Sequence, residues 1–374
     1  MLDPLAPYRN DLGRPVEELD TPVLCLDLDL LEQNIARAAQ LFRQHGKHWR
    51  PHTKGYKTPQ LARRVLAAGA VGLTCAKLAE AEALAHAGLT GGLLVANQVV
   101  GPQKMARLAR LAQRAEVIVT IDHADHVAML QQAAQEHGAT FSVLVELDIG
   151  MRRAGVASPQ AALALAQRIE RTPGVQLAGI MGYEGHLLDL PDQDEKRRRI
   201  YQALDILGEA RELMQNKGIP CPIVSAGGSG SLPVTITHPA VTELQAGGLV
   251  MMDAYYARKC QLEGFDHALT IRTTITSRPA ADRAVIDAGL KTQHVEYAEP
   301  LFLDAPPVVH FDTPSAEHAT LRLEGEAQGL PIGRRLTMVP GYSDLTNVLH
   351  NLFHVHRQGV VEELWPLESR GHLR

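Results

Sequence analysis

Short apolar runs alternate with amphipathic helical runs from about residue 20 to residue 250 of the chain. The run Val23–Leu28 is strand-like, and apolar positions at helical spacing follow it from Leu31 to Phe42. The clearest later helical patterns span Gln103–Arg114 and His126–His137. Short apolar runs separated by amphipathic helices are typical of parallel strands that helices cover.

Eight further strand candidates follow the first, and eight parallel strands are the number that closes a (β/α)8 barrel. They lie at His48–His52, Val71–Cys75, Leu93–Ala96, Val117–Ile121, Phe141–Glu146, Leu177–Tyr183, Ile223–Ala226 and Thr242–Ala246. One of the nine strands is therefore left over. An open, doubly wound sheet is the competing architecture, but no Gly-x-Gly-x-x-Gly sequence follows Val23–Leu28, which weakens a dinucleotide-binding interpretation.

The pattern changes after about residue 262, where helical periodicity mostly disappears and Gly and Pro become frequent. Strand candidates there are Thr270–Ser277, Ala284–Asp287, Val308–Phe311, Ala319–Leu323 and Arg335–Val339. The segment Val355–Val361 reads as a late hairpin. We therefore predict a β domain appended to the barrel.

Composition and charge narrow the class of protein. A chain of 374 residues that is 45% hydrophobic can bury a large core. A net charge of −5 and 4% aromatic residues give no sign of a nucleic-acid partner. We expect no secretory signal, because the N-terminus Met1–Pro4 shows no basic segment followed by an apolar one. No apolar run is long enough to span a membrane, and the four cysteines are widely spaced. We expect a cytoplasmic protein with reduced thiols.

Lys54 lies in the sequence Arg50-Pro-His-Thr-Lys-Gly-Tyr-Lys57, directly after the second strand candidate. Barrels keep their chemistry at the carboxyl ends of the strands. Neighbouring positive charge and burial lower the pKa of a lysine, so Lys54 is a candidate for Schiff-base formation with an aldehyde, and His52 lies beside it. The alternative is a basic surface loop.

Ser225–Ser231 has the sequence Ser-Ala-Gly-Gly-Ser-Gly-Ser and follows a late strand candidate, where barrels often bind phosphate. Successive N–H groups and serine hydroxyls can cradle a phosphate group, whereas the alternative is a flexible turn. A lysine on an early strand and a phosphate site on a late one together suggest pyridoxal phosphate.

Two other strand ends carry candidate side chains. Arg153 could reach an anionic oxygen of a cofactor or a substrate, or could be a surface arginine paired with Asp148. Tyr183 could pack on a cofactor ring and His186 could act as an acid or base; alternatively, both are structural or solvated.

Three histidines near the C-terminus have spacings that are compatible with a metal. His350 and His354 would share a face of a helix, whereas His354 and His356 would share a face of a strand. A solvated tail is the simpler interpretation.

These motifs resemble the D-threonine aldolase and D-serine dehydratase family of pyridoxal phosphate enzymes, which has the alanine-racemase-like fold. The resemblance covers nearly the whole chain. The segments that carry it are Arg50–Lys54, Ser225–Ser231, Glu243–Gly247 with Met252–Tyr256, Asp287–Lys291 and Gly359–Trp365.

The resemblance implies a domain arrangement and a set of binding residues. Residues 1–28 would join the β domain, 29–262 would form the cofactor-binding barrel, and 263–374 would form the C-terminal β domain. A homodimer is usual in this fold. The candidate cofactor-binding residues are Lys54, Arg153, Tyr183, Ser225, Gly227, Gly228, Ser229, Gly230, Gln245 and Tyr256.

The chain departs from the family at a metal site. Metal-dependent members carry a histidine and, two residues on, an Asp or Cys; here these positions are Tyr342 and Asp344. Tyr56 also replaces a frequent histidine. A tyrosine is a poor ligand near neutral pH, so Asp344 would bind Mn, Mg or Zn weakly, with another histidine, or not at all.

The resemblance implies a lyase that cleaves D-β-hydroxy-α-amino acids into glycine and an aldehyde. The candidate catalytic residues are Lys54, His52, Tyr56, Tyr342 and His186. A dehydratase of D-β-hydroxy-amino acids and an amino-acid racemase are the alternatives within the same cofactor class. A non-catalytic pyridoxal phosphate carrier is a third, but the residues after 262 argue against it.

Overall fold

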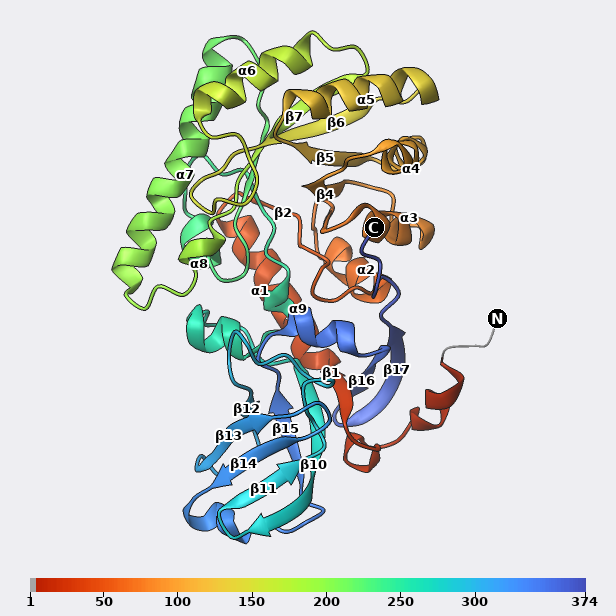
Figure 1. The fold of residues 1–374 in the computed structure, drawn as a ribbon, viewed down its shortest axis with the longest axis vertical. Helices are drawn as coiled ribbons and strands as arrows, with labels where there is room; N and C mark the ends of the chain where they lie inside the picture. The colour runs from red at the N-terminus through yellow and green to blue at the C-terminus, as the bar shows by residue number, and fades with distance from the viewer. Residues whose placement is uncertain (1–4) are drawn as a thin grey trace. The chain divides into compact units, whose positions relative to one another are not determined.

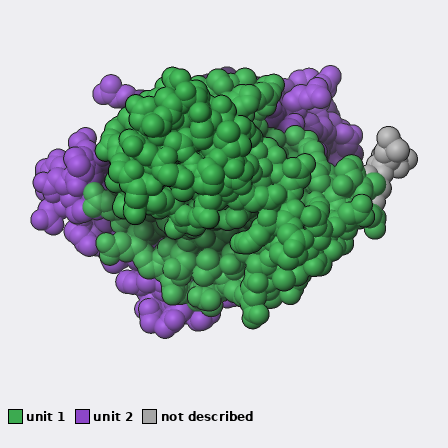
Figure 2. All heavy atoms as spheres, turned by 90° about the horizontal axis from the view of Figure 1, so that it is seen from below, with its two compact units in different colours: residues 1–37, 248–370 green, residues 38–247, 371–374 purple. Residues whose placement is uncertain are grey.

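The computed structural model describes residues 5–374, so Met1–Pro4, on which the signal-peptide expectation rests, lies outside the described residues. The chain divides into two compact units, which Figure 2 colours separately. The barrel unit comprises Ala38–Gly247 and Gly371–Arg374, and the β unit comprises the residues up to Arg37 with Gly248–Arg370. The domain boundaries expected at residues 28 and 262 stay a prediction.

The barrel unit contains an eight-stranded parallel sheet in the order β2-β9-β8-β7-β6-β5-β4-β3. Its strands are β2 (His48–Trp49), β3 (Leu73–Cys75), β4 (Leu93–Gln98), β5 (Val117–Ile121), β6 (Phe141–Glu146), β7 (Val175–Met181), β8 (Ile223–Ala226) and β9 (Glu243–Leu244). Backbone hydrogen bonds from Val71 to Trp49 (2.8 Å) and from Thr74 to Pro51 (2.9 Å) join the two ends of this order. The predicted barrel is therefore confirmed, and the open doubly wound sheet is excluded.

Helices follow most of the barrel strands, as Figure 1 shows. They are α2 (Pro59–Ala67), α3 (Leu78–His86), α4 (Pro102–Ala112), α5 (Ala124–His137), α6 (Pro159–Glu170), α7 (Gln193–Asn216) and α8 (Leu232–Thr235), with the short η3 (Gly185–Leu187). The local sequence explains where two of these helices begin or end. The Ser158 side chain accepts a hydrogen bond from the Ala161 N–H at the start of α6, and Gly138 has a left-handed backbone (φ 62°) at the end of α5. Each of α2 to α7 buries an apolar face.

The β unit contains a nine-stranded mixed sheet with the path β13-β14-β11-β10-β1-β16-β17, to which β15 attaches at β10 and β12 at β15. Its strands are β1 (Val23–Asp27), β10 (Leu269–Ala280), β11 (Arg283–Ile286), β12 (Leu301–Phe302), β13 (Val309–Pro314), β14 (Ala319–Leu323), β15 (Arg335–Val339), β16 (Leu352–Arg357) and β17 (Val360–Pro366). Cys25 of β1 faces Thr270 of β10 and His354 of β16. The strand left over from the barrel thus belongs to this sheet, as predicted.

Short helices complete the fold. They are η1 (Ala6–Asp11), η2 (Val16–Glu18), η4 (Gly248–Val250), the π-helical η5 (Tyr255–Lys259), η6 (Gly325–Gly329), α9 (Ser343–Thr346) and η7 (Asn347–Leu349), with the longer α1 (Leu28–Gln44) near the N-terminus. Within the described range, no helix combines the length and the apolar character needed to cross a membrane.

The late hairpin is confirmed as β16 and β17, joined by Gln358 and Gly359, whose φ values of 48° and 78° suit a tight hairpin turn. The alternative in which His350 and His354 lie on one helix is not observed. His354 lies in β16, whereas His350 precedes this strand and its Nε2 lies 2.7 Å from the carbonyl of Thr292. The two side chains therefore do not share a helix face.

Candidate active site

Lys54 lies on a tight turn just beyond β2, at the carboxyl end of the barrel strands, as the sequence predicts. The turn is tied to β3, because the backbone N–H of Thr53 donates to the carbonyl of Thr74 at 2.7 Å. The backbone N–H of Lys54 donates to Nδ1 of His52 at 3.4 Å. Lys57 closes the turn with an ion pair to the buried Glu80. Lys54 itself is half-buried, so the alternative of a freely exposed basic loop is wrong.

His52 and Tyr56 flank Lys54 with opposite shifts in pKa. Burial lowers the pKa of His52 well below its usual value, and the nearby charges of Lys54 and Lys57 lower it further. His52 is therefore a neutral imidazole. Burial raises the pKa of Tyr56, and electrostatic interactions with Cys75 and Glu80 raise it further. The Tyr56 hydroxyl is buried and has no hydrogen-bond partner among residues 5–374. A phenolate at Tyr56 is strongly disfavoured.

The glycine-rich loop connects β8 to α8, and its glycines lie where a larger side chain would press against neighbouring residues. A Cβ on Gly228 would lie 3.3 Å from the Tyr183 ring, and one on Gly227, which is left-handed (φ 73°), would lie 2.9 Å from Thr235. Gln245 Nε2 donates to Ser225 Oγ at 3.0 Å. The loop is thus a close-packed backbone cradle rather than a flexible turn, and it fits a phosphate group.

A buried carboxylate that the sequence does not single out braces this loop. Glu184 accepts hydrogen bonds from the backbone N–H of Gly227 (3.3 Å) and from Thr235 Oγ1 (2.5 Å). Its side chain is fully buried. A glutamate next to a glycine at a strand end looks like a solvated loop residue in sequence, so only the fold reveals its position.

Arg153 and Tyr183 lie together at the ends of β6 and β7. The Arg153 guanidinium lies 5.9 Å from the centre of the Tyr183 ring, and one of its nitrogens is 4.0 Å from Glu146. Asp148 instead accepts hydrogen bonds from the backbone of Gly150 and Arg152. The alternative pairing of Arg153 with Asp148 is therefore not observed, and the arginine, 57% exposed, is available to an anion.

His186 packs against Gly150, where an added Cβ would lie only 2.7 Å from its Nε2. Gly150 has a φ of 119°, which favours glycine, so the loop after β6 can approach the imidazole closely. Burial lowers the pKa of His186, and the charge of Arg199 lowers it further. The imidazole is therefore neutral near pH 7 and can accept a proton.

The remaining candidates, Tyr256, Tyr342 and Asp344, lie in the β unit. The Tyr342 hydroxyl donates to Asp344 Oδ2 at 2.8 Å, and the rings of Tyr256 and Tyr342 are 6.1 Å apart. Asp253 is fully buried and accepts hydrogen bonds from the backbone of Tyr256 and Ser343, each at 2.8 Å. The candidate residues thus form two groups, one in each compact unit.

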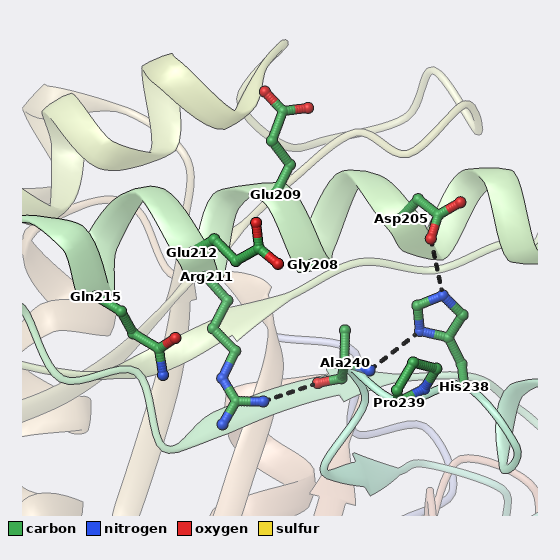
Figure 3. Close-up of a pocket in the computed structure, with 9 residues that line it drawn as sticks. All are labelled: Asp205, Gly208, Glu209, Arg211, Glu212, Gln215, His238, Pro239 and Ala240. Atoms are coloured by element: carbon green, nitrogen blue, oxygen red, sulfur yellow. Dashed lines mark hydrogen bonds and ion pairs between the residues drawn. The ribbon is translucent and has the colours of Figure 1, made fainter.

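A separate cavity of about 660 Å³ lies between the second half of α7 and the loop before β9, as Figure 3 shows. His238 Nε2 lies 3.2 Å from Asp205 Oδ1, and its Nδ1 accepts a hydrogen bond from Ala240 at 3.3 Å. The loop precedes β9, so this cavity is at the amino end of that strand. None of the candidate residues lines it.

Two protein-family models match the chain. Residues 26–254 match the N-terminal domain of alanine racemase, and residues 268–356 match a serine dehydratase domain. These two matches cover the barrel with its Lys54 turn and the greater part of the β sheet.

Individual relatives match almost end to end. A D-threonine aldolase of an Arthrobacter species is 36% identical over 97% of this chain and 96% of its own length. A 3-hydroxy-D-aspartate aldolase of Paracoccus denitrificans is 34% identical over 96% and 94%. A D-threo-3-hydroxyaspartate dehydratase of a Delftia species is 28% identical over 88% and 92%. The crystal structure of D-threonine aldolase from Filomicrobium marinum superposes with a TM-score of 0.93 at 35% identity, covering 97% of this chain and 99% of the other.

Proposed function

The chain belongs to the family of pyridoxal phosphate-dependent enzymes with the alanine racemase N-terminal domain, and on that premise we propose that it cleaves D-β-hydroxy-α-amino acids into glycine and an aldehyde. The observation that carries this proposal is the match to two aldolases over nearly the full length of the chain. The reaction needs no second substrate: the Cα–Cβ bond breaks, the β-hydroxyl loses its proton, and Cα gains one.

The barrel unit offers residues that fit the cofactor. Lys54 would hold its aldehyde carbon, and the Ser225–Gly230 backbone with the Ser225 and Ser229 hydroxyls would bind its phosphate. Tyr183 and Arg153 would lie against its ring and oxygens, and Gln245 would orient Ser225. Tyr256 is a further proposed contact of the phosphate, by family resemblance. When bound, pyridoxal phosphate supplies an electron sink that stabilises negative charge at Cα.

We propose His186 as the group that takes the β-hydroxyl proton within the barrel unit. Its lowered pKa leaves a free imidazole lone pair at neutral pH, whereas the raised pKa of Tyr56 opposes that role for the phenol. His52 is neutral and accepts the Lys54 backbone N–H at Nδ1, so it orients the turn that carries the lysine. Tyr342 remains a second candidate for proton transfer.

Dehydration is the second candidate reaction, because the match to a D-threo-3-hydroxyaspartate dehydratase also spans most of the chain. Racemisation is less supported, because the alanine racemases match about half of the chain.

Product analysis distinguishes aldol cleavage, dehydration and racemisation. D-Threonine would give acetaldehyde and glycine by aldol cleavage, ammonia and 2-oxobutyrate by dehydration, and L-allo-threonine by inversion at Cα.

The homodimer rests on the family resemblance, whereas the cytoplasmic location rests on the four widely spaced cysteines. We propose a homodimer and a cytoplasmic location. Size-exclusion chromatography with light scattering tests the first, because a mass near twice the 40.7 kDa of the chain is expected. A mass of one chain would contradict it.

A further inference from the structure

Tyr342 and Asp344 stand where metal-dependent relatives carry a histidine and an acidic or thiol ligand, and the structure shows what the tyrosine does instead. Its hydroxyl donates a hydrogen bond to Asp344 Oδ2 at 2.8 Å. Asp344 is 7% exposed and Tyr342 is half-buried, so this bond is partly shielded from water. One carboxylate oxygen of Asp344 is therefore already paired with a phenol proton.

The ring of Tyr342 lies among other aromatic rings. The Tyr342 ring lies 5.4 Å from the ring of Tyr255 and 5.0 Å from that of Tyr297. The ring centre of His294 lies 6.4 Å from that of Tyr342, and His294 Nε2 lies 3.4 Å from Glu296 Oε2. Nowhere in residues 5–374 do three His, Cys, Asp or Glu side chains gather in a way that could hold a metal ion.

The chemistry of Tyr342 and Asp344 as ligands disfavours a divalent cation between them. Mn²⁺, Mg²⁺ and Zn²⁺ prefer carboxylates, imidazoles and water, and a neutral phenol binds them poorly. An unperturbed tyrosine has a pKa of about 10, so a metal would have to displace the phenol proton and the hydrogen bond to Asp344 together. The two side chains present do not fit the metal that the family resemblance implies.

The backbone holds Tyr342 rigidly in this arrangement. A Cβ on Gly341 would lie 2.1 Å from the carbonyl oxygen of Ala298, so only glycine lets the segment before Tyr342 approach so closely. On the other side, Asp253 accepts hydrogen bonds from the Ser343 N–H at 2.8 Å and from its hydroxyl at 2.6 Å. The backbone on both sides of Tyr342 is thus held in place by the fold.

We infer that the Tyr342–Asp344 hydrogen-bonded pair takes the place of a divalent cation in this chain, so that its lyase activity does not depend on added metal. The inference deepens the proposed function and rests on it for the activity. The metal-binding part can be tested without any turnover. The hydroxyl of Tyr342 and the carboxylate of Asp344 can exchange a proton along their hydrogen bond without a metal.

The experiment measures Mn²⁺ binding to chelator-treated protein by equilibrium dialysis. The wild type should bind no stoichiometric Mn²⁺, whereas Tyr342→His should gain about one ion per chain, because imidazole and carboxylate two residues apart are suitable ligands. Tyr255→His is the matched control, since it places an imidazole in the same aromatic cluster without that spacing to Asp344. It should gain nothing.

Stoichiometric Mn²⁺ on the wild type would overturn the inference, whether or not Asp344→Asn removes it. A Tyr342→His protein that folds, by circular dichroism, yet binds no Mn²⁺ would also count against it. Should that variant fail to fold, Tyr342→Phe serves instead: its activity should fall and stay equal in Mn²⁺ and in chelator, and restoration by Mn²⁺ would refute the idea. If the wild type lacks lyase activity altogether, the proposed function fails while the binding result still stands.

Discussion

Lys57 and Glu80 form an ion pair behind the turn that carries Lys54, and their side chains are only 9% and 1% exposed. Glu80 also accepts a hydrogen bond from the backbone N–H of Ala76 at 2.6 Å, at the start of α3. Lys57 adopts a left-handed backbone (φ 43°), which a non-glycine residue rarely does. The pair therefore anchors the end of the Lys54 turn to the connection between β3 and α3.

Breaking this pair should destabilise the barrel unit strongly. Lys57→Met leaves the Glu80 carboxylate buried and uncompensated, which costs about 3–5 kcal/mol. Replacing both residues by methionine should recover most of that loss, since an apolar pair of similar volume is often tolerated. Urea unfolding of the three proteins checks this. A double variant as unstable as the single one would show that the hydrogen bonds from the Ala76 and Lys77 N–H groups to Glu80, not the ion pair, hold the turn.

Lys54→Ala should abolish covalent attachment of pyridoxal phosphate. The visible absorbance of the cofactor-loaded protein should disappear after gel filtration, while the circular dichroism stays unchanged, because Lys54 is half-buried in a turn whose other contacts remain. Lys217→Ala, at an exposed position after α7, is the control and should keep the absorbance. If Lys54→Ala retained the protein-bound chromophore, another lysine would have to be assigned.

Gly228→Ala should weaken the binding of pyridoxal phosphate more than that of pyridoxal. The added methyl would lie 3.3 Å from the Tyr183 ring and push outward the backbone that we propose binds the phosphate. We expect a loss of about tenfold, which is about 1.4 kcal/mol, in affinity for the phosphorylated form. Gly91→Ala is the control, since nothing lies within 4 Å of its Cβ. Equal losses for both ligands would place the loop away from the phosphate.

Asp253 makes the stability of the β unit depend on pH. Burial raises its pKa from 3.8 to about 7 in the folded protein. Between these values the unfolded chain has lost the proton that the folded chain keeps, so stability falls as the pH rises through this window. The full effect is about 4 kcal/mol. The stability advantage of the wild type over Asp253→Asn should therefore shrink from pH 5 to pH 8 in urea unfolding. An advantage that grows with pH would reverse this assignment.

Much of the barrel could be predicted because parallel strands buried on both faces appear as continuous apolar runs, such as Val117–Ile121. The Lys54 turn and the Ser225–Ser231 loop were also visible, since their position after a strand fixes the edge on which they lie. Glu80 and Glu184 were not, because a buried carboxylate has no sequence signal of its own. Nor was β12, whose two residues are too few to show alternation.

The histidines near the C-terminus show a different limit of the sequence. A spacing of four suits a helix and a spacing of two suits a strand, and His350, His354 and His356 offer both. Only the pairing of β16 with β1 and β17 decides between them. The Tyr342–Asp344 hydrogen bond was likewise beyond prediction, because residue types alone do not show whether two side chains face each other.

The most direct test of the proposed function is product analysis with D-threonine and, separately, L-threonine, each in the presence of Mn²⁺ and of chelator. The account predicts acetaldehyde and glycine in equal amounts from D-threonine, little from L-threonine, and the same rate with metal or chelator. Ammonia and 2-oxobutyrate without acetaldehyde would contradict aldol cleavage and favour the dehydratase. Acetaldehyde that chelator abolishes would keep the aldolase and refute the metal-independent Tyr342–Asp344 pair.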